Sequence, residues 1–385
     1  MPAILYLVHD VTDPAVARRV TMLTAGGASV RVAGFRREGR LAPARLGAGT
    51  PIDLGMTRDG RFAQRIAAVA RAALGLRQAL VGLAAPDIII ARNLEMLALA
   101  GRVAGLYRST PAIVYESLDI HRLLFGNGAV SATLRTIERR LAADAALLMT
   151  SSPAFLREYF EPYGQVSGPV ELVENKVLAL GGEHQAPPSR PQGGRPWVIG
   201  WFGALRCRRS LAILKQVAEN MDGAIEVVMR GRPAYREIPD FDAQVRDAPH
   251  LRFEGAYEPE DLPSHYVAVD FCWAIDFFEA GQNSEWLLPN RLYESGAHGV
   301  VPIARANTET ARFLQARNIG IVLDEGSADD LVARLSDLTK EELQRLSARQ
   351  QALDASTWTY GVEDCRALVQ RLAALAPSQP MEAAA

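Results

Sequence analysis

The stretch WVIGWFGALRCRRSLAILKQVAENMDGAIEVVM, residues 197–229, decides the fold class of this chain. Its apolar run Trp197–Phe202 is followed by a segment suited to a helix, Ser210–Asn220, and then by a second apolar run, Ala224–Met229. Short apolar strands that alternate with helices are typical of a parallel β-sheet covered by helices on both faces. The stretch therefore predicts an α/β fold.

The same alternation continues on both sides of this stretch. We expect further strands at Ile4–Val8, Val30–Gly34, Asp87–Ala91, Ala112–Tyr115, Ala146–Thr150, Val267–Trp273 and Val300–Ala304, and helices at Pro14–Ala25, Gln64–Ala84, Leu94–Tyr107 and Ser131–Ala143. Residues 181–196, GGEHQAPPSRPQGGRP, interrupt the pattern with four glycines and four prolines, which is typical of a linker. We therefore expect a doubly wound domain at 1–180, a linker at 181–196 and a second doubly wound domain at 197–358.

Composition and charge exclude several classes of protein. Of the 385 residues, 49 % are hydrophobic and 22 % are charged, which are ordinary values for a globular chain. The 42 basic and 44 acidic residues nearly balance, so overall charge does not favour a nucleic-acid partner. The halves differ, because residues 1–190 hold 22 basic against 16 acidic residues (+6) and residues 191–385 hold 20 against 28 (−8).

The three cysteines, Cys207, Cys272 and Cys365, are too few and too widely spaced for a disulfide framework, which favours a reducing compartment. The start MPAILYLVHD lacks the features of a signal peptide, and no run of eighteen apolar residues is present. We therefore expect a cytoplasmic protein. The helix expected at 64–84 spreads its three arginines around its circumference, which favours a helix half-buried on the domain and leaves contact with a membrane surface as the alternative.

Several well-known catalytic motifs are missing. The chain contains no GxxxxGK[ST], no GxSxG and no HExxH, and its first strand is followed by HDVTDP instead of GxGxxG. Asp270 and Asp276 flank an expected strand six residues apart, a spacing that does not aim both carboxylates at one metal ion. We therefore expect neither a bound metal nor a nicotinamide oxidoreductase.

Two stretches in the C-terminal half, LRFEGAYEPEDLPSHYVAVDFCWAI from Leu251 and EAGQNSEWLLPNRLYESGAHGVVPIA from residue 279, resemble the nucleotide-sugar-binding half of GT-B glycosyltransferases, particularly the family 4 group. Glu294, Gly299 and Pro302 match that pattern position by position. IGWFGALRCRRS, residues 199–210, matches the strand and loop of the same family at Gly203.

The N-terminal segments DIIIARN, IVYESLDIHRLLFG, LLMTSSPAFLREYF and VELVENKVL follow the order found in bacterial exopolysaccharide glycosyltransferases of the succinoglycan type. In outline the resemblance covers most of residues 1–375, although its specific motifs occupy only about residues 199–305.

The resemblance implies a GT-B fold, in which two Rossmann-like domains face each other across a cleft, and a helix within 359–385 that crosses back to the first domain. It implies a hexosyltransferase that needs no cofactor and takes a nucleotide diphosphate sugar, most commonly a UDP-sugar, as donor. The acceptor would be a glycan, commonly lipid-linked, in exopolysaccharide or cell-surface polysaccharide synthesis. The basic N-terminal half is compatible with peripheral contact with an anionic membrane at its cytoplasmic face.

The resemblance also assigns the donor site. Arg209, in place of the family's lysine, and Arg291 would hold the diphosphate, while Glu294, three residues further along the same helix, would accept hydrogen bonds from the ribose hydroxyls. Alone, Arg291 and Glu294 would be read as an ordinary ion pair within a helix. Ala204 and Ser210 depart from the family's phosphate loop.

Further donor contacts are expected on neighbouring loops. Arg230 and Tyr257 would lie near the base, and Asn290 is either a donor contact or a helix cap. Backbone N–H groups of residues 281–284 would point toward the diphosphate. The family has an acidic residue eight positions before Glu294, where this chain has Trp286, with Glu285 one place away.

For catalysis, the acceptor hydroxyl needs a proton acceptor from the first domain. Asp119, in the turn YESLDIH, is the first choice, with His121 and Glu116 as alternatives in the same turn, and a helix cap is the competing role for Asp119. Arg92 and Asn93 end another strand and would contact a substrate or cap the next helix. The residues leave open whether the anomeric configuration is inverted or retained.

Three other functions are alternatives for a chain of this pattern. A GT-B epimerase would convert the nucleotide sugar without an acceptor, and a non-catalytic protein would bind the donor without turnover. A phosphorylase would need a lysine for pyridoxal phosphate, and the three lysines of this chain are poorly placed for it.

Overall fold

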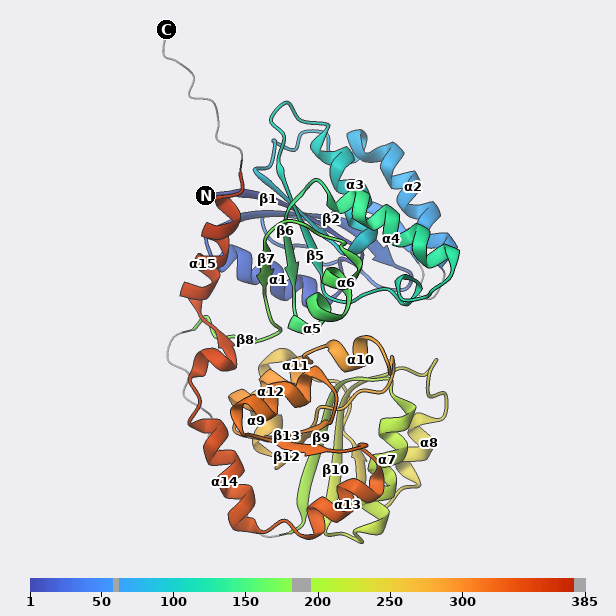
Figure 1. Cartoon of the computed structure of the whole chain (residues 1–385), viewed down its shortest axis with the longest axis vertical. Helices are drawn as coiled ribbons and strands as arrows, with labels where there is room; N and C mark the ends of the chain where they lie inside the picture. The colour runs from blue at the N-terminus through green and yellow to red at the C-terminus, as the bar shows by residue number, and fades with distance from the viewer. Residues whose placement is uncertain (58–61, 182–194, 377–385) are drawn as a thin grey trace. The chain divides into compact units, whose positions relative to one another are not determined.

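The structure is a computed structural model that describes residues 1–57, 62–181 and 195–376 (Figure 1). The chain forms two compact units, one made of residues 1–173 together with the chain from Tyr360, and the other made of residues 174–359. Within the segment expected as a linker, 181–196, residues 182–194 lie outside the described residues.

The first unit is built on a seven-stranded parallel sheet with the order β3-β2-β1-β4-β5-β6-β7. Its central strands β1, β4, β5 and β6 are almost wholly buried because helices cover both faces of the sheet, whereas the edge strands β3 and β7 are partly exposed. The elements are β1 Ala3–Val8, α1 Pro14–Ala25, β2 Ser29–Arg37, β3 Ile52–Thr57, α2 Phe62–Ala79, β4 Ile88–Arg92, α3 Asn93–Ala104, β5 Ala112–Ser117, η1 Arg122–Leu124, α4 Ala129–Ala142, β6 Ala145–Thr150, α5 Pro153–Phe155, the π-helical η2 Leu156–Phe160, α6 Glu161–Tyr163, β7 Val170–Leu172 and α15 Val362–Ala373.

The second unit is built on a six-stranded parallel sheet with the order β11-β10-β9-β12-β13-β14. A large apolar cluster around Trp201, Phe271 and Trp273 forms its core. The elements are β8 Val177–Leu178, β9 Trp197–Leu205, α7 Arg208–Asn220, β10 Ile225–Pro233, α8 Phe241–Arg246, β11 Leu251–Phe253, η3 Pro259–Asp261, α9 Leu262–Val267, β12 Phe271–Trp273, α10 Asn283–Trp286, α11 Asn290–Ala297, β13 Val301–Arg305, α12 Glu309–Arg317, β14 Ile321–Leu323, α13 Ala328–Ser336, α14 Lys340–Gln351, η4 Ala355–Thr357 and β15 Thr359–Tyr360, which pairs with β8.

The expectation of two doubly wound parallel sheets is confirmed. In each sheet the strand order changes direction once, between β1 and β4 in the first unit and between β9 and β12 in the second. Open α/β sheets bind ligands beyond the carboxyl ends of their strands at such a switch point. The fold therefore marks one ligand-binding edge in each unit.

One expected strand begins later in the structure than the sequence predicts. Val267 ends α9, and β12 covers only Phe271–Trp273 instead of Val267–Trp273. The reason is Asp270, whose carboxylate Oδ2 accepts a hydrogen bond from the Val198 backbone N–H at 2.8 Å and fixes a turn ahead of the strand.

The last helix, α15, packs against α1 within the first unit. A Cβ at Gly26, just after α1, would lie 2.2 Å from the carbonyl oxygen of Cys365 in α15. Glycine at residue 26 therefore permits the close approach of these two helices.

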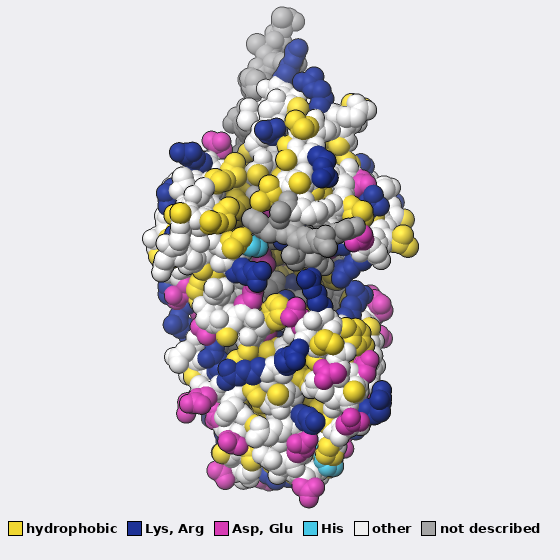
Figure 2. Space-filling view, turned by 90° about the vertical axis from the view of Figure 1, so that its right-hand side faces the viewer, with side chains coloured by type: hydrophobic (Ala, Val, Ile, Leu, Met, Phe, Trp, Pro, Cys, Tyr) yellow, Lys and Arg dark blue, Asp and Glu magenta, His cyan; other side chains and the backbone are white. Residues whose placement is uncertain are grey.

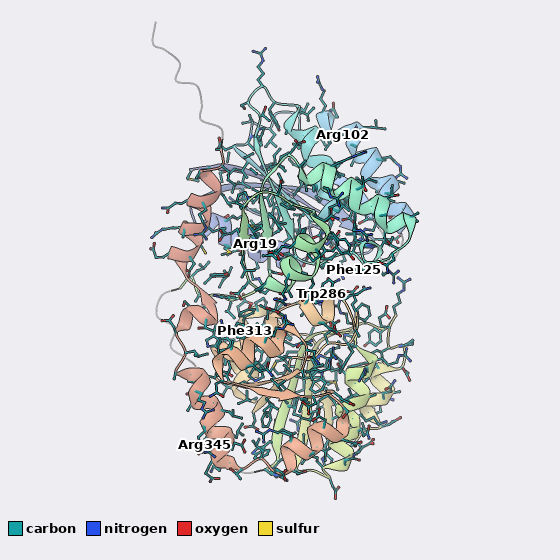
Figure 3. All side chains as sticks on the ribbon, viewed as in Figure 1. Arg19, Arg102, Phe125, Trp286, Phe313 and Arg345 are labelled. Carbon is teal, nitrogen blue, oxygen red and sulfur yellow. The ribbon has the colours of Figure 1, made fainter. Side chains whose placement is uncertain are left out.

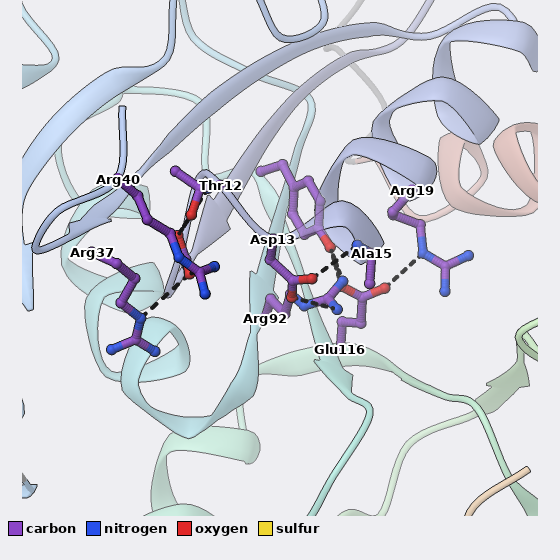
Figure 4. A network of polar contacts seen from close by, with 10 residues as sticks. Thr12, Asp13, Ala15, Arg19, Arg37, Arg40, Arg92 and Glu116 are labelled. Carbon is purple, nitrogen blue, oxygen red and sulfur yellow. Dashed lines mark hydrogen bonds and ion pairs between the residues drawn. The ribbon is translucent and has the colours of Figure 1, made fainter. Parts of the chain in front are cut away.

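A buried ion network ties the first unit together (Figure 4). Glu116, at the end of β5, is fully buried, and its Oε1 accepts a hydrogen bond from Arg19 Nε at 2.7 Å. Its Oε2 accepts from the Tyr6 hydroxyl and from Arg92 at 3.4 Å. Burial alone would raise the pKa of Glu116, but the two guanidinium charges and these hydrogen bonds outweigh it and lower that pKa. Glu116 is thus a structural carboxylate.

Candidate active site

Arg291 and Glu294 are the second and fifth of the eight residues of α11, a helix that contacts β12 and β13 of the second sheet. Glu294 Oε2 accepts a hydrogen bond from the Tyr266 hydroxyl of α9 at 3.0 Å, and Arg291 donates to the Ile275 carbonyl at 3.3 Å. Both side chains are half-buried, so neither is sealed inside packed protein. Asn290 is exposed as the first helical residue, and Pro289 occupies the N-cap position.

Tyr257 lies close to this pair. Burial raises the pKa of its phenol, the Glu294 carboxylate raises it further, and the Arg291 guanidinium opposes the change. The ring also meets Phe202 edge-on, with centroids 6.4 Å apart. The structure therefore brings together Tyr257, Arg291 and Glu294, which the sequence placed in one donor site.

Gly203 lies near the end of β9, where it is paired with Gly231 of β10. Both glycines have positive φ, +107° and +131°. A Cβ at residue 231 would lie 1.9 Å from the Gly203 carbonyl oxygen, so glycine at residue 231 lets the two strand ends run this close. Arg230, the preceding residue, forms an ion pair with Glu254 instead of joining the α11 pair.

Arg209 lies in the first turn of α7, exposed, with its guanidinium carbon 4.1 Å from the centroid of the Phe277 ring. Arg305, the last residue of β13, approaches the same ring at 5.6 Å. Its Nε is buried and has no hydrogen-bond partner in the described part of the chain, as is also true of Arg291 Nε. Two arginines therefore approach one aromatic ring at the strand ends, an arrangement suited to an anion.

Sequence reasoning missed Arg305. Its only local signal was a basic residue directly after an expected strand, and its relation to Arg209 depends on Phe277, which lies in a different loop. A third guanidinium, that of Arg206, packs over the neighbouring Phe278, 4.5 Å from the ring centroid.

The loop before α11 differs from the expectation. Glu285 Oε1 accepts from the Gly281 N–H at 3.1 Å and from Arg305 at 2.7 Å, while the N–H groups of Gln282 and Ser284 donate to the Glu279 carbonyl. Three of the four backbone N–H groups expected to face a diphosphate, those of residues 281, 282 and 284, therefore already have acceptors within this segment. Residues 283–286 form the short helix α10. Trp286, labelled in Figure 3, is half-buried there.

In the first unit, Asp119 is exposed in the loop after β5. His121 caps η1, where its Nδ1 accepts a hydrogen bond from the Leu123 N–H at 3.3 Å. Burial lowers the pKa of His121, partly offset by the carboxylates of Glu95 and Asp119. The unprotonated nitrogen of His121, Nδ1, is therefore occupied by the hydrogen bond that caps η1. The Asp119 side chain, in contrast, is exposed.

No metal centre is evident from residues 1–57, 62–181 and 195–376. Within these ranges, no three histidine, cysteine, aspartate or glutamate side chains gather as metal ligands would.

Two doubly wound parallel sheets in two compact units are the architecture of the GT-B glycosyltransferases. Known structures of similar fold include HepE of Anabaena in complex with UDP and glucose, with a TM-score of 0.67 at 14 % identity over 96 % of this chain and 99 % of that one. Sucrose-phosphate synthase from Thermosynechococcus elongatus matches with a TM-score of 0.70 at 14 % identity over 97 % and 98 %.

Residues 13–176 match the glycosyl transferase 4-like domain. The chain is 52 % identical over 385 residues to the succinoglycan biosynthesis protein ExoL of Rhizobium meliloti (strain 1021), which covers 99 % of this chain and 95 % of that relative. The chain therefore belongs to the glycosyltransferase family that carries this domain and includes that protein, and it is a transferase enzyme.

Proposed function

We propose that this enzyme transfers a hexose from a UDP-sugar to a lipid-linked glycan during exopolysaccharide synthesis. The 52 % identical relative is named for succinoglycan biosynthesis, and a structure of similar fold holds UDP and glucose. The observation that carries the proposal is the half-exposed pair Arg291 and Glu294 on α11, with Tyr257 and the arginines around Phe277 nearby.

The donor chemistry follows from these groups. Charge builds on the diphosphate as it leaves, and guanidinium groups already held in place stabilise that charge without reorganising. Arg209, Arg291 and Arg305 would supply this stabilisation, and Glu294 would accept hydrogen bonds from the ribose hydroxyls. Tyr257 would contact the nucleoside beside Glu294.

The acceptor hydroxyl must lose a proton as its oxygen bonds to the anomeric carbon. The carboxyl edge of the first sheet would supply the proton acceptor, with Asp119 and His121 as the candidates named from sequence.

The donor assignment predicts a thermal shift. At about 100 times its dissociation constant, a ligand that binds only the folded protein stabilises it by about 2.7 kcal/mol, which raises the melting temperature by several degrees. We expect UDP and UDP-glucose to produce this shift in differential scanning fluorimetry, and ADP-glucose and GDP-mannose to produce less. If none of the four compounds moved the melting temperature, the donor assignment would be wrong.

Membrane contact is part of the proposal. No helix in the described portion of the chain is long and apolar enough to span a bilayer. Helices α2 and α4, which both contact α3, nevertheless leave apolar side chains exposed: Ile66 at 52 %, Leu74 at 83 %, Val130 at 65 % and Ile137 at 43 %. Arg77 is also exposed on α2. Figure 2 views the side of the molecule that bears these helices, where hydrophobic and basic side chains intermingle. Such a surface suits an anionic bilayer.

We expect Arg77→Glu to reduce binding to phosphatidylglycerol-containing vesicles at least fivefold, because each basic residue near the surface contributes about 1 kcal/mol. Leu74→Glu should have an effect of similar size. Cosedimentation measures binding, and Arg345→Glu, on the exposed side of α14 (Figure 3), is the control with the same charge change. Equal loss in all three variants would point to net charge alone and against this surface.

A further inference from the structure

The chain passes between the two units twice, once at each end of the stretch 174–359. At these two points the chain pairs with itself. Strand β8 forms a two-stranded sheet with β15, and the Val177 N–H donates a hydrogen bond to the Trp358 carbonyl at 2.9 Å. We call residues 174–178 and 355–359 the two joining segments of the second unit.

The helix α11, which carries Arg291 and Glu294, is too short to hold its own orientation. It has eight residues, and its N-cap residue, Pro289, makes no side-chain hydrogen bond to it. Isolated helices shorter than about 12–15 residues are marginal in water. The direction in which Arg291 and Glu294 point therefore depends on the residues that pack around the helix.

The first joining segment bonds to the start and the middle of α11. Ahead of the helix, Asn175 Nδ2 donates a hydrogen bond to the Leu288 carbonyl at 3.2 Å. Within the helix, the Tyr293 hydroxyl donates to Glu174 Oε1 at 2.9 Å, across 119 residues of sequence. These two bonds attach α11 to the segment through which the chain enters the second unit.

The second joining segment supports the far end of α11. A Cβ at Gly296 would lie 2.1 Å from Cε3 of Trp358, so the indole packs against the helix backbone. Trp358 is buried in one apolar cluster with Leu292 and Tyr293. The two joining segments therefore fix α11 at its start, its middle and its end.

Tyr293 is the residue that sets the rotation of α11 about its axis. It directly precedes Glu294, and successive residues of a helix are about 100° apart around the axis. Its side chain is fully buried, whereas Arg291 and Glu294 are half-buried. Because a buried ring with an anchored hydroxyl resists rotation of the helix, the bond from Tyr293 to Glu174 also fixes where Glu294 and Arg291 point.

Glu174 is itself held in place by a charge. Its Oε2 lies 3.2 Å from Lys176 Nζ, and both side chains are only 16 % exposed. Lys176 Nζ also donates to the Ser356 carbonyl of the second joining segment at 2.8 Å. Hydrogen bonds to a charged acceptor are stronger than those between neutral groups, which suits the bond from Tyr293 to an anchoring role.

We propose that Glu174 is a positioning residue of the donor site. Acting through Tyr293, it fixes the rotation of α11 and so aims Glu294 and Arg291 at the nucleoside diphosphate. The inference rests on the donor roles proposed for those two residues. It makes the joining segment a determinant of donor affinity.

Isothermal titration calorimetry with UDP-glucose tests this role in Glu174→Ala, Tyr293→Phe and the double variant. We expect each single change to weaken binding about five- to tenfold, because the anchoring hydrogen bond is lost and the donor residues remain. The double variant should bind no more weakly than the weaker single variant, since all three lack the same bond. Glu174→Gln keeps an acceptor oxygen for Tyr293 and should bind within about twofold of the wild type.

The matched control is Glu171→Ala, three residues before Glu174 and in the first unit. It breaks an ion pair with Arg371 at 2.6 Å and should leave UDP-glucose binding unchanged. The same titration separates positioning from a fault in folding. A variant that only loses folded protein shows a lower binding stoichiometry at an unchanged dissociation constant. Tyr293→Phe removes one oxygen atom and keeps the inference testable if Glu174→Ala folds poorly.

Three results would each overturn the inference: binding within twofold of the wild type in Tyr293→Phe, effects of the two single changes that multiply in the double variant, or Glu174→Gln as weak as Glu174→Ala. A wild-type enzyme that does not bind UDP-glucose would instead refute the proposed function.

Discussion

Replacing Glu294 by glutamine is expected to weaken UDP-glucose binding about 100-fold. A hydrogen bond to a charged group contributes about 1.5–3 kcal/mol, and the proposed role gives the carboxylate two of them from the ribose. Glutamine keeps one acceptor oxygen, which can still receive the Tyr266 hydroxyl, but it loses the charge and the second acceptor. Isothermal titration calorimetry measures the change directly.

The control for this variant is Tyr266→Phe. It removes the phenol that holds Glu294 Oε2 at 3.0 Å and leaves the carboxylate in place. We expect it to weaken UDP-glucose binding less than tenfold, because orientation is lost and charge is not. A Glu294→Gln variant that bound UDP-glucose within threefold of the wild type would show that Glu294 does not contact the ribose.

Replacing Glu116 by alanine is expected to lower the free energy of unfolding by about 3–5 kcal/mol. The variant leaves the guanidinium groups of Arg19 and Arg92, 7 % and 4 % exposed, without their shared carboxylate. Breaking one side of a buried ion network carries this cost because the remaining charges stay desolvated. Urea denaturation followed by circular dichroism gives the value.

Glu363→Ala is the matched control, because it breaks an ion pair with Arg366 whose glutamate is 83 % exposed. Exposed pairs contribute about 1 kcal/mol or less. Since the folded-state pKa of Glu116 is lowered, its stabilisation is present above the ordinary value of 4.5 and fades as the pH falls through the folded-state pKa. The stability gap between wild type and Glu116→Ala should therefore narrow in acid. A constant gap would contradict the assigned charge state.

The helices and strands that were expected were predictable because their signals are local, whereas the six-residue β3 and the helices α12, α13 and α14 were not expected. The helix expected at Pro14–Ala25 matches α1, since Asp13 caps it, proline starts it and glycines follow it. The three-residue strands β7, β11 and β14 were not predicted, because so few residues carry no periodic pattern. They are strands only through pairing with a longer neighbour, as in the alignment of Val170 with Leu148.

The candidate site was only partly predictable. Helical spacing put Arg291 and Glu294 on one face, but it could not show that Tyr266, 28 residues earlier, would hold the carboxylate. Arg305 gave no motif. It became notable only when the fold placed it beside Phe277, which comes from a different loop.

The order of apolar runs and helix signals alone determined that this chain makes two parallel sheets, because burial on both faces of a strand demands continuous apolar sequence. Only the tertiary structure decided which polar residues are available for chemistry. Glu116 and Asp119 are three residues apart in one turn, yet the first is fully buried among Tyr6, Arg19 and Arg92 and the second is exposed. Burial and charge depend on neighbours brought from other strands and helices, and no local pattern encodes them.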